Sequence, residues 1–147
     1  MIAAVLSMAL IGADPFYVGA WRISSAAAAP WASTERKPAL DESKALTGNV
    51  VKIEAQRIVG PKQVACAKPK FAVKSYGVDM LFQGQFAEWK SRDKSVDMAK
   101  AAAAAGFVNG REWKTLETGC ETEIDFHFID TGTAAFGLNN VIYTMKK

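Results

Sequence analysis

The chain has 147 residues, half of them apolar, and a formal net charge of +3 at pH 7. This length and composition suffice for one hydrophobic core, so we expect a single domain over residues 14–147. The basic residues form no dense face of the kind that binds nucleic acid, so a nucleic-acid partner is excluded from our expectations.

The first thirteen residues, MIAAVLSMALIGA, carry no charge. An apolar run that ends in small residues, here Gly12 and Ala13, is typical of a secretory signal segment, although the usual basic residues do not precede it. A helix that spans a bilayer needs about 20 apolar residues, so we expect no integral membrane segment. The prediction is a signal segment at residues 1–13 and a periplasmic or secreted protein. A buried N-terminal strand or helix is the alternative.

Cys66 and Cys120 are the two cysteines of the chain. An even number of cysteines in an exported protein predicts a disulfide, here one that joins the middle of the chain to its last strands. Two unpaired buried thiols in a cytoplasmic protein are the alternative.

Residues 16–23 (FYVGAWRI) are predicted to form the first strand. Gly19 allows a close backbone approach there, and Trp21 offers the largest side chain for burial. An alanine run at residues 26–29 leads to Pro30, which rules out a simple helical continuation. Residues 33–44 are polar and predict an exposed loop, with a short helical turn at residues 41–45.

Residues 48–59 are predicted to form the second strand, because apolar and polar side chains alternate along them. Val51, Ile53 and Ala55 are expected to face inward. Shorter segments at residues 64–66 and 71–76 predict two further strands.

Residues 77–93 show no regular pattern, yet they carry many large apolar side chains. A loop this apolar must pack on the core, on a partner or on a ligand, so we expect function here. The candidate ligand-binding residues of this stretch are Met80, Leu81, Phe82, Phe86 and Trp89.

Residues 95–105 predict one alanine-rich helix. Ser95 is expected to be its N-cap, Asp97 suits the positive end of the helix dipole, and Gly106 is a typical C-terminal stop.

Apolar and polar side chains alternate in residues 121–130, which predicts a strand with one buried and one solvated face. The apolar set is Ile124, Phe126 and Phe128, and the polar set is Glu123, Asp125 and His127. After a turn at residues 130–133, the sequence AAFGLNNVIYTM predicts one long partner strand. With residues 111–118, these elements predict a mainly β protein: a small antiparallel β-barrel of about seven to eight strands with one helix.

Glu123, Asp125 and His127 would project from one face of a strand, about 6 to 7 Å apart. A metal ion would need a further ligand from an adjacent strand, so a solvated face is the preferred interpretation. The sequence Asp130-Thr131-Gly132 matches the aspartic protease motif, but a hairpin turn explains it better. No activated serine or cysteine is present, so we assign no catalytic residue, expect no cofactor and no metal, and favour a function other than catalysis.

The segment Gly19-Ala20-Trp21, followed by mostly β sequence and a disulfide near the late strands, resembles the lipocalin-like branch of the calycin barrels. The chain is most similar to small lipocalin-like proteins exported by Gram-negative bacteria. The resemblance implies that Trp21 lies at the closed floor of a barrel.

Together these observations predict a secreted or periplasmic binding protein. It would hold a small apolar ligand in the barrel mouth, above Trp21 and gated by residues 80–89. The alternative is a protein-interaction module, such as an inhibitor of a periplasmic hydrolase or an envelope assembly factor. The expected partner is accordingly a small hydrophobic molecule or a periplasmic protein.

Overall fold

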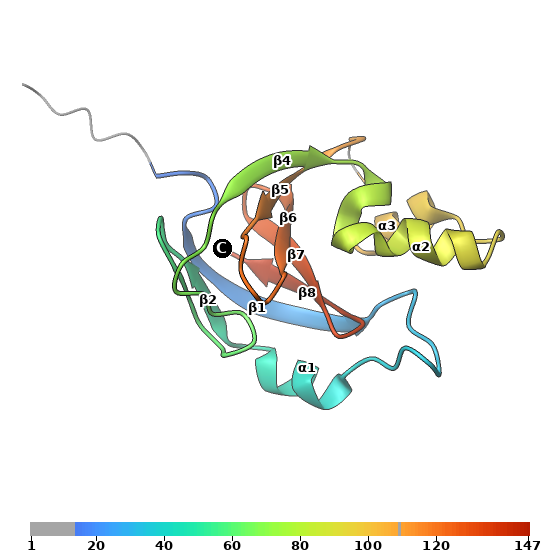
Figure 1. Ribbon diagram of the computed structural model, residues 1–147, viewed down its shortest axis with the longest axis horizontal. Coiled ribbons are helices and arrows are strands. Elements are labelled where there is room, and N and C mark those ends of the chain that lie inside the picture. The colour runs from blue at the N-terminus through green and yellow to red at the C-terminus, as the bar shows by residue number, and fades with distance from the viewer. Residues whose placement is uncertain (1–13, 109) are drawn as a thin grey trace, which may run out of the picture.

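A computed structural model describes residues 14–108 and 110–147, and its centre is one curled antiparallel sheet (Figure 1). In the described residues eight strands follow the order β3-β2-β1-β8-β7-β6-β5-β4. Their bounds are β1 Gly19–Ala28, β2 Val50–Ile53, β3 Ile58–Val59, β4 Ala72–Tyr76, β5 Trp113–Glu117, β6 Asp125–Asp130, β7 Thr133–Leu138 and β8 Val141–Lys146. The predicted fold class is confirmed as a mainly β half-barrel, whose edges are β3 and β4.

The interior of the curled sheet is filled by apolar side chains from seven strands and α1 (Leu40–Leu46). Large members that are completely buried come from β1, β6, β7 and β8, and the Phe136 and Tyr143 rings stack with centroids 4.9 Å apart. We call this set the interior cluster; its buried aromatic members are Trp21, Phe126, Phe128, Phe136 and Tyr143.

The opposite face of β5 to β8 is covered by the helical segment between β4 and β5. This segment contains the 3-10 helix η1 (Val78–Gly84), α2 (Gln85–Arg92) and α3 (Met98–Ala104), and Figure 1 shows α2 and α3 grouped on one side of the sheet. We call the second apolar set the helix-side cluster; its buried members include Trp31, Leu81, Phe82, Phe86, Phe107, Trp113 and Ile142.

The first strand begins later and runs further than the sequence predicts. Residues 16–18 precede β1, whereas the alanines at positions 26–28 belong to it. The first half of β1 pairs with β2 and the second half with β8, with a bulge between Ile23 and Ser25. Ala27 and Ala28 of this strand line a groove whose other side includes Ala101 and Ala104 of α3.

The predicted strand at residues 48–59 is two short strands, β2 and β3, and Ala55 is exposed in the turn between them rather than facing inward. Residues 64–66 form no strand. Only Cys66 makes an isolated bridge, to Ile58 of β3.

Residues 77–93 are helical where the sequence indicated irregular structure. The helices are interrupted because Phe82, Gln83 and Gly84 have φ angles of 51°, 60° and 77°, which lie in the left-handed region. This change of direction starts α2 at Gln85, so that Phe86 is buried against the sheet.

The alanine-rich helix is present as α3, but its N-cap is Asp97 and not Ser95. Asp97 Oδ1 accepts a hydrogen bond from the Lys100 backbone N–H at 3.1 Å, which satisfies one free donor of the first turn. The short helical turn expected near residue 41 is α1, Leu40–Leu46.

The end of the chain forms three strands where the sequence predicted two. Asn139 and Asn140 have φ angles of 48° and 61°, so they form a two-residue hairpin turn between β7 and β8. The Asp130-Thr131-Gly132 segment is the β6–β7 turn, in which Asp130 Oδ1 accepts from the Gly132 N–H at 2.9 Å.

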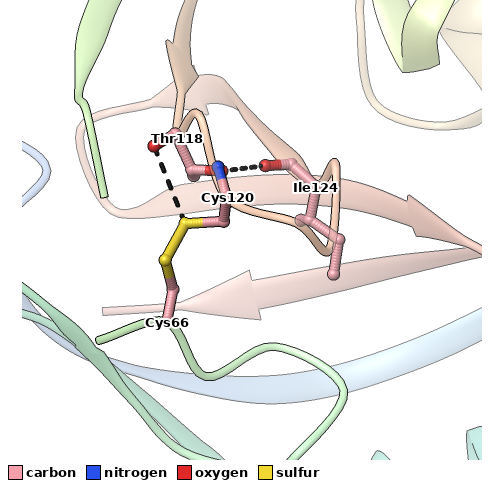
Figure 2. Close-up of a disulfide and its surroundings, with 4 residues drawn as sticks. All are labelled: Cys66, Thr118, Cys120 and Ile124. Atoms are coloured by element: carbon pink, nitrogen blue, oxygen red, sulfur yellow. Dashed lines mark hydrogen bonds between the residues drawn. A yellow bond between two sulfur atoms is a disulfide. The ribbon is translucent and has the colours of Figure 1, made fainter. Parts of the chain in front are cut away.

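Cys66 and Cys120 form the predicted disulfide, with Cα atoms 6.2 Å apart (Figure 2). The loop that carries Cys120 is held by Thr118, whose hydroxyl donates to the Ile124 carbonyl at 2.8 Å. The disulfide therefore fixes the segment after β3 to the loop between β5 and β6.

The predicted signal segment, residues 1–13, lies outside the described residues. Within the described part of the chain, the helices are too short or too polar to cross a membrane.

Candidate functional site

The structure separates the six residues predicted to bind a ligand. Trp21 belongs to the interior cluster, whereas the other five lie on or near η1 and α2 on the opposite face of the sheet. Leu81, Phe82 and Phe86 are buried there, Trp89 is partly buried, and Met80 is 48% exposed. These five residues therefore do not stand above Trp21 at one barrel mouth.

A cleft of about 220 Å³ lies where the η1–α2 junction meets β6 and the β7–β8 turn. We call it the amide cleft, because four carboxamide side chains line it beside one carboxylate and two aromatic rings. Its lining residues are Trp31, Phe82, Gln83, Gln85, Asp125, His127, Gly137, Leu138, Asn139 and Asn140.

One wall of the amide cleft is built by the left-handed turn at residues 82–84. The Phe82 backbone N–H donates to His127 Nε2 at 2.9 Å, and the Gln83 side-chain amide donates to the Glu123 carbonyl. Gly137 fits closely against Phe82, since a Cβ atom there would lie 3.2 Å from the ring. Non-glycine residues held at positive φ cost conformational energy and occur disproportionately at binding and catalytic sites.

The opposite wall is the β7–β8 turn. It is held by two backbone hydrogen bonds, from the Ala29 N–H to the Asn140 carbonyl at 2.9 Å and from the Ala39 N–H to the Asn139 carbonyl at 3.1 Å. Segments far apart in the sequence thus fix the position of the two asparagines.

His127 is 1% exposed, which corrects the prediction that its face of the strand is solvated. Because Nε2 accepts from Phe82, the ring proton is on Nδ1, which donates to Thr115 Oγ1 at 2.8 Å. Burial lowers the pKa of His127 to about 3. The ring is therefore neutral with both nitrogens engaged, which suits a structural role better than that of a general base.

Asp125 lies two residues earlier on the same face of β6 and is half-buried. Burial first, and then the charge of Glu117 opposite it on β5, raise the pKa of Asp125 to about 6. Glu117 itself accepts from the Tyr76 hydroxyl and pairs with Lys74 Nζ at 2.9 Å. A backbone hydrogen bond from Thr118 and the charge of Lys74 oppose this shift, and Asp125 is the carboxylate that lines the cleft.

Gln85 presents a buried acceptor without a partner, because its Oε1 atom receives no hydrogen bond. Buried polar atoms are satisfied in the large majority of cases, so this lining residue carries an acceptor to which the protein supplies no donor. The side-chain nitrogens of Gln83, Asn139 and Asn140 already donate to protein oxygens, namely Glu123 O, Glu42 Oε1 and Lys37 O. Each of these three carboxamides keeps its oxygen and one N–H for a ligand.

The expected row of Glu123, Asp125 and His127 is not formed. Glu123 has a φ of 56° and precedes β6, so only the other two share the strand face. Across residues 14–108 and 110–147, no group of three or more His, Cys, Asp or Glu side chains could hold a metal ion.

The sequence analysis singled out Phe82, Asp125 and His127 but missed the remaining polar lining of the cleft. The available signals were the Asn139-Asn140 pair, which is typical of a tight hairpin turn, and Gly84 next to two glutamines.

Searches for similar proteins give no family model, no curated protein and no solved structure that matches this chain.

Proposed function

We propose that the protein is a small-molecule-binding protein of the periplasm or the extracellular space, and that its ligand occupies the amide cleft. The observation that carries this proposal is a cleft that is built by a left-handed turn and lined by Gln85, whose buried Oε1 atom has no partner. The volume of about 220 Å³ suits a compact ligand.

Two further features support this proposal. The disulfide is compatible with an oxidising compartment, where such bonds persist. The curled sheet and the Gly19-Ala20-Trp21 segment agree with the resemblance to lipocalin-like proteins, although the large side chains inside the sheet point to a ligand outside it.

A fragment screen by NMR tests this proposal. Uniformly ¹⁵N-labelled protein is titrated with fragments, and the side-chain amide signals of Gln83, Asn139 and Asn140 are followed. We expect saturable shifts at these signals, weakened in Gln85→Met, which has a similar volume but no acceptor. Fragment shifts confined to other parts of the protein, or no binding at all, would contradict the proposal and favour the protein-interaction module.

A second candidate function is carriage of the small apolar ligand that the sequence predicts, at a different place. A groove of about 370 Å³ lies between the alanine side of β1, β8 and α3, within the size range of ligand sites. Its lining is mostly apolar: Ser25, Ala27, Ala28, Pro30, Ala101, Ala104, Ala105, Ile142 and Thr144.

An apolar fluorescent probe distinguishes the two candidates. Ala104→Phe would fill the groove and leave the amide cleft intact. If this variant no longer binds the probe, the result supports an apolar ligand in the groove. Unchanged probe binding in Ala104→Phe counts against it, provided that circular dichroism shows the variant folded.

A further inference from the structure

We propose that the amide cleft selects a primary ammonium group carried on a short apolar chain. This inference rests on the proposed function and adds the chemical class of the ligand. It follows from which polar atoms of the lining are already used and which are left.

The only charged group left in the lining is a hydrogen-bond acceptor, the carboxylate of Asp125. Three of the four amide nitrogens donate to protein oxygens, and both nitrogens of His127 are bonded to the protein. The carboxylate of Asp125, the unpaired Oε1 of Gln85 and the other amide oxygens can accept, and each of the three bonded amide nitrogens keeps one N–H. An ammonium group offers three donors and no acceptor, which matches these acceptors.

The charge of the cleft has the sign that attracts a cation. Asp125 is the one charged side chain among the lining residues, which include no Lys or Arg. Hydrogen bonds between an ammonium and a carboxylate are shorter and stronger than those between neutral groups. A carboxylate ligand would instead meet Asp125 as a like charge.

The aromatic part of the lining favours the same ligand. Trp31 and Phe82 lie beside each other, with ring centroids 5.7 Å apart, and both line the cleft. Aromatic faces attract cations, and they also pack against a short alkyl chain.

The test compares three probes of nearly equal size: n-butylammonium, n-butanol and n-butyrate. Each is titrated into ¹⁵N-labelled full-length protein, and the side-chain amide signals of Gln83, Asn139 and Asn140 report the site. We expect saturable shifts with n-butylammonium and at least tenfold weaker binding of the other two probes.

Two variants assign the selectivity to the cleft. Asp125→Asn should weaken n-butylammonium binding about tenfold, since a charge-assisted hydrogen bond becomes a neutral one. Gln85→Met should weaken it several-fold, while Asp14→Asn, an exposed acid distant in sequence, should leave it unchanged. Circular dichroism verifies folding, and if Gln85→Met does not fold, Asp125→Asn alone decides.

The outcomes separate this inference from the proposed function. If n-butanol or n-butyrate binds as tightly as n-butylammonium, ammonium selection is wrong and the cleft remains a binding site. If screened fragments shift the signals of the lining amides but n-butylammonium does not, the ammonium inference is wrong and the proposed function still stands. If nothing shifts them, both the inference and the proposed function fail.

Discussion

At the scale of single residues, His127 and Asp125 share one face of β6 but respond differently to pH. Burial lowers the folded-state pKa of His127, so the unfolded chain takes up a proton first as the pH falls. Its contribution to stability is fully present above the unfolded pKa of 6.5 and is lost as the pH falls toward 3. For Asp125 the folded-state pKa is raised, so its contribution is present below the unfolded pKa of 3.8 and is lost as the pH rises through about 6.

Replacing His127 by Gln should flatten the acid side of the stability profile. The Gln side chain can accept from the Phe82 N–H and donate to Thr115, but it does not titrate. From the two pKa values, protonation of His127 in the unfolded chain should lower the free energy of unfolding by about 3 kcal/mol when the pH falls from about 8 to about 4. Urea denaturation of both proteins across this range measures the difference. Parallel profiles for the two would show that His127 does not titrate on unfolding.

The opposite effect is expected for Asp125→Asn. At about pH 8 the ionised carboxylate is held half-buried near Glu117, so the variant should be more stable than the wild type by about 1 to 2 kcal/mol, allowing for solvent screening. The gain should fade as the pH falls below 6 and be nearly gone by about pH 4, where Asp125 is protonated in the folded wild type. A carboxylate kept at a cost to folding fits a binding role.

Chemical denaturation of Asp125→Asn and of the control Asp14→Asn at both pH values measures this gain. A variant less stable than the wild type at about pH 8 would show that Asp125 is stabilised as the anion by contacts within the protein.

At the scale of elements, the strands with clear alternation of apolar and polar side chains could be predicted, although the polar face of β6 is buried at His127 as well. This holds for β2 and β6, and the α3 helix follows from its alanine content. The η1–α2 segment could not be predicted, since it turns at Phe82 and Gln83, side chains that seldom adopt positive φ. That conformation depends on His127, 45 residues away in the chain.

The amide cleft could not be predicted from local sequence patterns either, because it also depends on contacts between distant residues. Its polar residues come from the η1–α2 junction, from β6 and from the β7–β8 hairpin turn, which the sequence analysis placed within a single strand. Only the pairing of β6, β7 and β8 brings them together, and this pairing is a property of the whole sheet.

The β7–β8 turn gives a prediction at this scale. Because Asn140 has a φ of 61°, Asn140→Gly should stabilise the fold by about 0.5 to 1 kcal/mol, and Asn140→Val should destabilise it by more than about 1 kcal/mol. The single side-chain hydrogen bond lost, from Asn140 Nδ2 to Lys37 O, is long at 3.4 Å. Thermal denaturation of the two variants measures the effect. Equal melting temperatures would mean that the turn is not held in this conformation.

At the scale of the whole molecule, no β ladder joins the two edges of the sheet in the described residues. The connecting segment between β3 and β4 and the disulfide link them instead. Cys66 bridges to Ile58 of β3, and Cys120 lies in the loop after β5, which pairs with the edge strand β4. A hydrogen bond from the Lys70 N–H to the Thr118 carbonyl, 2.7 Å long, runs parallel to this link. The disulfide therefore holds the open side of the half-barrel. Its Cys120 is connected to the wall of the amide cleft through Glu123, whose N–H donates to the Cys120 carbonyl at 3.0 Å and whose carbonyl accepts from Gln83.

Removing both sulfurs should loosen this open side without abolishing the cleft. The disulfide spans 54 residues, for which the chain-entropy model gives about 4 kcal/mol, so Cys66→Ala/Cys120→Ala should lose up to that amount of unfolding free energy. Limited proteolysis should cut the variant first between β3 and β4, because the link that fixes this segment is gone. The amide signals of Asn139 and Asn140 should keep their positions under conditions where the variant is folded, since the β7–β8 turn does not contain the cysteines. The Gln83 signal should shift, because its amide donates to the Glu123 carbonyl and the Glu123 N–H donates to the Cys120 carbonyl at 3.0 Å. Wild-type protein treated with reductant is the matched control and should behave alike. Loss of the Asn139 and Asn140 positions together with the first cut would instead mean that closure of the sheet and formation of the cleft are one cooperative event.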